Sequence, residues 1–157
     1  MEQIKIREAT DVDVGDIQCL LQQEEDWHRT MYPDYFVDQG SKVPSDELLV
    51  ELNDPECRYI LAVDGTEVVG LVILKVKVFS NEPQFKKVEF VIVEDCIVRE
   101  DHRGHGIGTK LMKQAKEWAT SKGISRMQLQ VWARNDKAVR LYEALGYKSL
   151  VIRMELK

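Results

Sequence analysis

The sequence predicts a single domain of the mixed α/β class, with one central sheet and helices packed around it. The chain of 157 residues has the length of about one domain, and it contains no repeat, low-complexity tract or linker. Apolar residues recur at strand spacing and at helical spacing in turn along the chain. This succession indicates that strands and helices form one layered structure. We expect residues 1–157 to be one domain.

The first third of the chain predicts one strand and two helices. Residues 4–8 alternate apolar and charged side chains, as a short strand does. Thr10 can cap a following helix, whose apolar positions recur at helical spacing and which we expect to end near Met31. Ser45 can cap a second, shorter helix that ends near residue 52.

The middle of the chain predicts three long strands. Residues 59–79 read as two strands joined at Asp64-Gly65, a dipeptide that suits a tight hairpin turn. A polar stretch separates them from a third strand over residues 87–98.

The last third predicts two helices, each followed by a strand. An apolar face that includes Ile107, Leu111 and Trp118 indicates a helix that ends at Lys122-Gly123. We then expect a strand over residues 125–133, a helix over 135–147 and a final strand over 148–157. The expected order is β-α-α-β-β-β-α-β-α-β.

Composition and charge narrow the function. A net charge of −5 makes nucleic acid an improbable partner, since phosphate binding needs a clustered basic face. Three cysteines without CxxC spacing and three histidines do not suggest a zinc site, so we expect no metal and reduced thiols in the cytoplasm. The residues at the start do not resemble a signal peptide, and no apolar run is long enough to cross a membrane.

The stretch "RGHGIG" places three glycines within five positions directly before a predicted helix. Glycine lets several backbone N–H groups converge on an anion at the positive end of a helix. The spacing fits neither a P-loop nor a dinucleotide-binding fingerprint. A glycine-rich turn without a ligand is the alternative, although glycine costs about 1 kcal/mol at a helical position. The pattern therefore favours a phosphate-bearing ligand of another kind.

These residues resemble a known family. "RGHGIG" is similar to the Arg/Gln-x-x-Gly-x-Gly/Ala pyrophosphate loop of the GNAT superfamily of N-acetyltransferases, and it follows a strand ending in "DCIV" as in that family. Asn135, Ala138, Tyr142 and Gly146 resemble the family's later signature. The order of elements agrees over nearly the whole chain, with residues 3–90 expected to shape the acceptor site and 91–157 to bind acetyl-CoA.

The resemblance implies a GNAT-like fold with about four helices and a central sheet that is splayed at the acetyl-CoA site. The strand ending at Val98 would part from the strand around 127–131, and the Ile97 amide would polarise the thioester carbonyl. The expected coenzyme-binding residues on this basis are Cys96, Ile97, Val98, Arg103, Gly104, His105, Gly106, Ile107, Gly108, Thr109 and Asn135. Arg103 could instead be a solvated loop residue, and Asn135 could merely cap its helix.

The implied chemistry is acetyl transfer from acetyl-CoA to a primary amine. An alkyl amine with a pKa near 10.4 is less than about 0.1% neutral at pH 7, so a base is needed. Glu94 and Asp95 are adjacent on the strand, and the resemblance favours Glu94 as that base; both could also be solvent-exposed acids. The resemblance assigns the proton for the leaving thiolate to Tyr142, whereas the helical pattern alone indicates a core tyrosine.

The acceptor remains open. Residues 22–39 combine acidic with aromatic side chains, a mixture that could hold a cationic amine or simply form a solvated helix face and a packed loop. A polyamine, aminoglycoside, amino acid or protein amine would all fit. A non-catalytic acetyl-CoA-binding module is the main alternative, and transfer of another acyl group or to a hydroxyl is a third. Since the family commonly dimerises through its C-terminal strands, a homodimer is one candidate assembly.

Overall fold

The computed structural model describes residues 3–38, 43–79 and 82–157. One five-stranded mixed sheet organises them, with the strands side by side in chain order. The first four strands are antiparallel, and the fifth runs parallel to the fourth. This arrangement confirms the predicted fold class. The strands are β1 (Lys5–Glu8), β2 (Cys57–Asp64), β3 (Glu67–Phe79), β4 (Val88–Val98) and β5 (Met127–Leu129).

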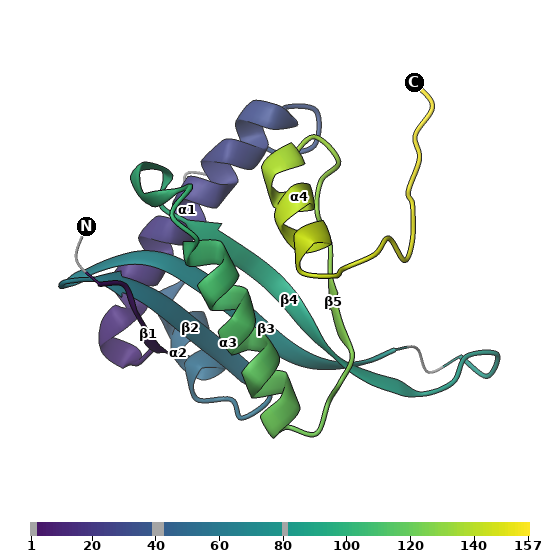
Figure 1. The fold of residues 1–157 in the computed structure, drawn as a ribbon. Coiled ribbons are helices and arrows are strands. Elements are labelled where there is room, and N and C mark those ends of the chain that lie inside the picture. The colour runs from purple at the N-terminus through teal and green to yellow at the C-terminus, as the bar shows by residue number, and fades with distance from the viewer. Residues whose placement is uncertain (1–2, 39–42, 80–81) are drawn as a thin grey trace.

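Helices cover both faces of this sheet (Figure 1). The helix α3 lies across one face, α1 and α2 lie on the other, and α4 stands beside β5. The four helices were predicted from apolar spacing, and the hairpin turn between β2 and β3 falls at Asp64-Gly65 as expected. Their bounds are α1 (Val14–Met31), α2 (Ser45–Leu52), α3 (Ile107–Ser121) and α4 (Asp136–Ala144), with short 3-10 turns at Asp11–Asp13 and Glu100–His102.

Two apolar clusters, one on each face of the sheet, form the core. Leu111, Ala115 and Trp118 of α3 pack on one face. Ile17 of α1 and Leu48 of α2 pack on the other, and both are nearly inaccessible to solvent. Because apolar helix stripes bury against the sheet on both sides, the strands between them are fixed in place.

The sheet opens between its last two strands. β5 pairs with β4 only at Val91–Val93, through Met127–Leu129. Beyond that point β4 continues to Val98 while β5 ends, and Figure 1 shows the two strands diverging with α4 at their side. The backbone of β4 that faces away from β3 is therefore left without a strand partner on its last residues.

Two predicted strands differ from the structure. The expected strand over 125–133 is regular only at Met127–Leu129, because the chain then leaves β4 to form the wall of a pocket. The expected strand over 148–157 is wrong: these residues have no regular secondary structure. Their pattern is that of a strand, with Leu150, Ile152, Met154 and Leu156 at alternate positions, but these side chains are between 73% and 98% exposed. A strand needs a neighbour for its backbone groups, and this segment has none within one chain.

Among the described residues, no helix is both long enough and apolar enough to span a bilayer.

Candidate active site

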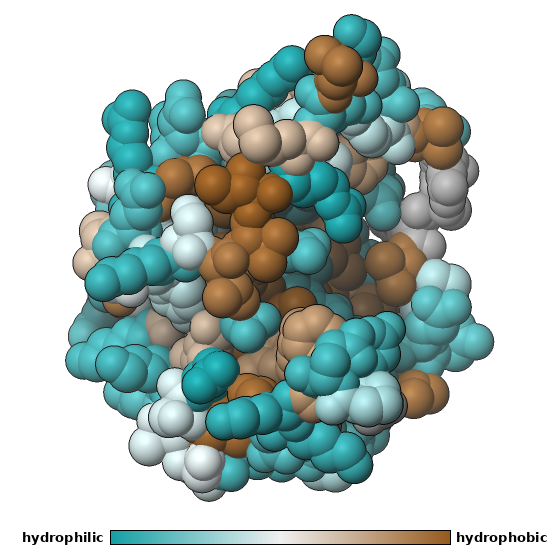
Figure 2. Space-filling view, turned by 90° about the vertical axis from the view of Figure 1, so that its right-hand side faces the viewer, coloured by the Kyte–Doolittle hydropathy of each residue, from teal (hydrophilic) through white to brown (hydrophobic). Residues whose placement is uncertain are grey.

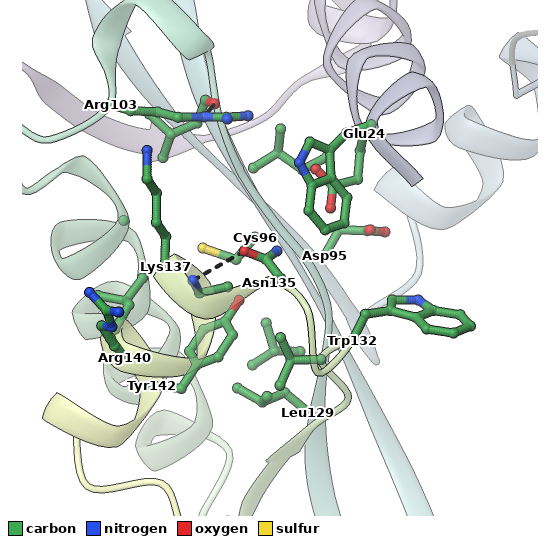
Figure 3. Close-up of a pocket in the computed structure, with 18 of the residues that line it drawn as sticks. Glu24, Asp95, Cys96, Arg103, Leu129, Trp132, Asn135, Lys137, Arg140 and Tyr142 are labelled. Carbon is green, nitrogen blue, oxygen red and sulfur yellow. Dashed lines mark hydrogen bonds between the residues drawn. The ribbon is translucent and has the colours of Figure 1, made fainter. Parts of the chain in front are cut away.

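A pocket of about 1000 Å³ lies where β4 and β5 separate. Its walls come from one face of α1, the end of β4, the glycine-rich loop, the segment after β5 and one side of α4. Figure 3 shows cationic side chains on one side of it and the carboxyl groups of Glu24 and Asp95 on the other, with Tyr142 between. The pocket therefore joins both halves of the chain at the gap in the sheet.

The register of β4 decides which of its backbone groups face the pocket. The Arg99 amide donates a hydrogen bond to the Val69 carbonyl of β3 at 2.8 Å. Since alternate residues of an antiparallel strand bond to the same neighbour, Ile97 also turns its N–H and C=O toward β3, opposite Leu71. Cys96 and Val98 turn theirs toward the pocket. The Ile97 amide is therefore turned away from the position in which the sequence predicted it would polarise a thioester, and the Cys96 amide faces the pocket instead.

The glycine-rich loop has the shape of an anion-binding turn. Gly104 and Gly106 both have left-handed backbone conformations, with φ of 79° and 78°, which residues with a Cβ rarely adopt. The first helical bond of α3 runs from Lys110 N–H to the Gly106 carbonyl at 3.1 Å. The amides of Ile107, Gly108 and Thr109 thus precede any helical acceptor and point out of the helix's positive end.

A third glycine allows two helices to come close together beside this loop. A Cβ built on Gly108 would lie 3.1 Å from Leu141 of α4, tighter than ordinary van der Waals contact. The absence of a side chain at Gly108 therefore brings α4, and the residues it carries, next to the loop.

His102, His105 and Arg103 contact residues next to the glycine-rich loop. His102 lies 2.7 Å from Asp101 and 3.1 Å from Asp64 in the β2–β3 turn, so it ties the loop to the sheet. His105 is exposed, with its Nδ1 3.3 Å from the His102 carbonyl. Arg103 donates from Nε to the Val98 carbonyl at 3.0 Å and lines the pocket. Arg103 is thus held at the pocket wall, whereas His105 lies outside it.

Two cations at this end of the pocket were not predicted. Lys137 and Arg140 of α4 line it together with Arg103 (Figure 3). They are three residues apart and so lie on one side of the helix. That spacing was readable in the sequence, but only the close approach of α4 at Gly108 shows that this side faces the glycine loop.

Tyr142 projects from α4 to the middle of the pocket, against Cys96 (Figure 3). Burial raises the pKa of Tyr142 above its ordinary value, and the neighbouring Cys96 raises it further. Burial also raises the pKa of Cys96 to about 12, so its thiol stays neutral. The Tyr142 hydroxyl is therefore protonated, and Cys96 is not activated as a nucleophile.

The two adjacent acids of β4 have different surroundings. Glu94 lies at a bulge, where β4 has one residue more than β3, and its carboxylate forms an ion pair with Lys75 at 2.9 Å. Lys75 also pairs with Glu51 of α2 at 2.7 Å. Asp95 has no ion pair or side-chain hydrogen bond within the described part of the chain. Burial, followed by the charge of Glu24, raises the pKa of Asp95 to about 7.

Asn135 has the structural role that its sequence position allows. Its side chain accepts a hydrogen bond from the Ala138 amide at 3.2 Å, as an N-cap of α4, and it also lines the pocket.

In residues 3–38, 43–79 and 82–157, no group of three His, Cys, Asp or Glu side chains is placed to hold a metal ion.

Comparison with known proteins identifies this architecture. A sequence profile of the acetyltransferase (GNAT) family matches residues 20–147. The thialysine N-epsilon-acetyltransferase of Mus musculus is 47% identical over 60 residues, a stretch that covers 38% of this chain and only 35% of that protein.

Solved structures agree with the fold. The tetramutant of the BH1408 protein from Bacillus halodurans has a TM-score of 0.89 at 22% identity, covering 98% of this chain and 99% of its own. The aminoglycoside N-acetyltransferase AAC(6')-Iy in complex with CoA has a TM-score of 0.72 at 16% identity, covering 100% of this chain and 95% of its own. With the family profile over most of its length, the chain belongs to the acetyltransferase (GNAT) family.

Proposed function

We propose that this protein is an acetyl-CoA-dependent N-acetyltransferase that moves the acetyl group directly to a primary amine. The observation that carries this proposal is the division of one pocket by charge. Arg103, Lys137 and Arg140 lie at the end beside the glycine loop, and Glu24 and Asp95 lie at the other. Anionic phosphates and a cationic amine would thus occupy opposite ends, with the reacting atoms between them.

The residues present fit coenzyme A. The free amides of the loop and of the first turn of α3 suit a pyrophosphate, and the nearby cations add charge. The pocket-facing backbone groups of Cys96 and Val98 suit a pantetheine arm, which would lie along β4 as an added strand does. Bound in this way, the coenzyme supplies an activated acetyl group near Tyr142.

The protein's own groups then have to move protons. The acceptor ammonium gives one proton to a pocket carboxylate, and its nitrogen bonds to the acetyl carbon as the carbon–sulfur bond breaks. The Cys96 amide stabilises the charge that develops on the carbonyl oxygen. Tyr142 donates its hydroxyl proton to the departing sulfur and regains one from the nitrogen. The products are an amide, a free thiol and one proton released to solvent.

Direct transfer is favoured over transfer through the enzyme. A covalent intermediate on Cys96 would require a thiolate, and burial holds the pKa of this thiol at about 12. The names of the relatives also support an amine acceptor, because the mouse relative is named for a lysine analogue and AAC(6')-Iy for aminoglycosides.

The test is release of free thiol from acetyl-CoA by the purified protein, with mass-spectrometric identification of the acetylated product. Amine-dependent release with an N-acetyl product is the expected result. Tight binding of acetyl-CoA without release for any amine would instead favour the non-catalytic module. Release without an amine, or acetylation of a hydroxyl, would contradict transfer to nitrogen.

We further propose that two copies of the chain assemble through residues 148–157. This segment carries five large apolar side chains that are mostly exposed. Figure 2 shows that apolar residues gather on the face of the molecule that forms the right-hand side of Figure 1. Because β5 is an edge strand, each copy offers a free edge to the other's segment.

The three free cysteines suit a reducing compartment such as the cytoplasm.

A further inference from the structure

One face of α1 forms a wall at the acidic end of the pocket. Glu24, Trp27, His28 and Met31 all line the pocket, and their spacing of three, four and seven residues places them on one side of the helix. Trp132, after β5, lines it as well. Apart from Glu24, this wall is aromatic or apolar.

An aromatic cluster holds that wall in place behind the pocket. The Trp132 ring lies 4.3 Å from Tyr32 and 5.5 Å from Phe36, measured between ring centroids. His28 stacks on Phe36 at 5.0 Å, and burial lowers the pKa of His28, so its imidazole is neutral at pH 7. The wall therefore presents flat, uncharged rings in fixed positions.

The carboxyl groups available to a ligand at this end are few. Glu24 and Asp95 point into the same region, and the charge of Glu24 raises the pKa of Asp95 because two nearby negative charges repel. Burial raises the pKa of Glu24 as well. Glu94 is already paired with Lys75 at 2.9 Å. A ligand with one positive charge would relieve the repulsion between Glu24 and Asp95.

The other acids of the 22–39 stretch are occupied or point elsewhere. Asp26 and Asp38 both pair with Arg29, and Asp34 pairs with Lys157 at 2.8 Å. None of these three lines the pocket. These three carboxylates are therefore not placed to bind further positive charges of a ligand in the pocket.

Arg134 is a cation on the same side of the pocket as the wall formed by α1. Arg134 lines the pocket, donates to the Met31 carbonyl at 3.0 Å and stacks over Tyr32 at 5.1 Å. It is thus fixed beside the wall formed by α1 and would repel a second positive charge on the acceptor.

From this arrangement we propose that the acceptor is a primary amine with a single positive charge on an apolar or aromatic body, and that Asp95 takes its proton with Glu24 beside it. The inference rests on the proposed acetyl transfer and names its acceptor class and base. One proton passes from the ammonium nitrogen to the Asp95 carboxylate, which leaves a neutral amine facing the acetyl carbon. Glu24 holds the ammonium and keeps that proton on Asp95 until transfer is complete.

The first test compares three amines with the same six-carbon chain: hexylamine, 1,6-diaminohexane and 6-aminohexanoate. They differ only in the far end, which is apolar, cationic or anionic. We expect kcat/KM to be at least about 10-fold higher for hexylamine than for 1,6-diaminohexane, which corresponds to about 1.4 kcal/mol, and no such loss for 6-aminohexanoate, whose carboxylate Arg134 attracts. A preference for the diamine would overturn the proposed class, and an equal loss for the diamine and for 6-aminohexanoate would show that Arg134 does not exclude the second charge. Binding of acetyl-CoA without acetylation of any amine would instead refute the proposed function.

The second test identifies the base. Asp95→Asn should lower kcat/KM for hexylamine by about 10²-fold or more and remove an ionisation near pH 7 from its pH profile. Glu24→Gln should raise KM for hexylamine. Glu25→Gln is the matched control, because Glu25 is exposed on the same turn and does not line the pocket. If Glu94→Gln removes the ionisation and Asp95→Asn does not, Asp95 is not the base. Retained calorimetric binding of acetyl-CoA by each variant shows that the fold is intact.

Discussion

Tyr142 and Cys96 illustrate how burial sets the role of a single side chain. Burial raises the pKa of both groups, and both lie in the middle of a pocket whose ends carry opposite charge. A neutral hydroxyl beside a neutral thiol can donate a proton but cannot attack a thioester. Desolvation favours the uncharged form of each group, which suits the donor role proposed for Tyr142.

Removing the Tyr142 hydroxyl tests its role directly. Tyr142→Phe keeps the ring that packs on Tyr147, with ring centroids 6.0 Å apart, and removes only the proton donor. We expect kcat to fall by about 10²-fold or more, with the dissociation constant of acetyl-CoA little changed. Stopped-flow thiol release and calorimetry measure the two quantities. An unchanged kcat would mean that water protonates the sulfur.

The ionisation of the buried Asp95 carboxyl should affect the stability of the protein as well as its activity. Its folded pKa of about 7 lies above the unfolded value near 3.9, so ionising it in the folded protein costs free energy. That cost is absent below about pH 4, grows between about pH 4 and 7, and is constant above about pH 7. Asp95→Asn should therefore raise the thermal midpoint at pH 8 relative to the natural sequence, and much less at pH 5. Equal shifts at both pH values would contradict the assigned pKa.

At the scale of one element, the start of α1 sets the position of the wall that the helix presents to the pocket. Asp13 is buried and receives two hydrogen bonds from Arg7 of β1, both at 2.8 Å, and one from the Thr10 amide at 2.8 Å. These contacts anchor the beginning of α1 to the edge strand. The Arg7 guanidinium lowers the pKa of Asp13 to about 2.

Loss of this anchor should destabilise the fold in a pH-dependent way. A pKa lowered from near 3.9 to about 2 contributes about 2 kcal/mol, present above about pH 4 and lost as the pH falls toward 2. Asp13→Asn should therefore lower the free energy of unfolding at pH 7 by about 2 kcal/mol, as measured in urea. Asp11→Asn in the same turn is exposed and serves as control. A loss that stays constant down to pH 2 would exclude this electrostatic origin.

Binding of acetyl-CoA at the glycine loop can be tested with a closely matched control variant. Gly106 and Gly123 have similar left-handed conformations, with φ of 78° and 74°, and neither has an atom within 4 Å of a built Cβ. Glutamate at either position adds the same backbone strain, but only Gly106→Glu sets a carboxylate beside the amides that face the pocket. Calorimetry should show binding of acetyl-CoA lost in Gly106→Glu and kept in Gly123→Glu. Retained binding in Gly106→Glu would mean that the phosphates lie elsewhere.

Apolar spacing was sufficient to predict the helices and the first four strands, because each buries one face against the sheet. The loop could be recognised because its glycines serve a conformation that other residues avoid. The bulge at Glu94 could not be predicted: strict alternation would send only one of Glu94 and Asp95 to the pocket, yet both line it. The alternating pattern of 148–157 was read as a strand, although pairing depends on a neighbour that one chain does not supply.

At the scale of the whole molecule, the C-terminal segment is the feature that one chain leaves unexplained. Its apolar side chains are more exposed than those of any helix, and it touches the body of the protein through Lys157 and Asp34 at 2.8 Å. Exposed apolar surface of this kind commonly marks an interface.

Deleting residues 148–157 tests the proposed assembly. Light scattering should report a dimer for the full chain and a monomer for the shortened one, with acetyl-CoA binding retained because the segment does not line the pocket. A full chain that is monomeric at micromolar concentration would remove the dimer from the account.

The central claim is that one pocket holds the coenzyme at its cationic end and the amine at its acidic end. The most direct measurement is the affinity of a conjugate in which the sulfur of CoA is joined through an ethylene bridge to the nitrogen of hexylamine, which stays a charged ammonium. The account predicts at least about 10²-fold tighter binding than CoA alone, because both ends are engaged at once. It also predicts that Asp95→Asn and Glu24→Gln reduce that advantage while leaving the affinity for CoA itself. A conjugate that binds no better than CoA would contradict the claim.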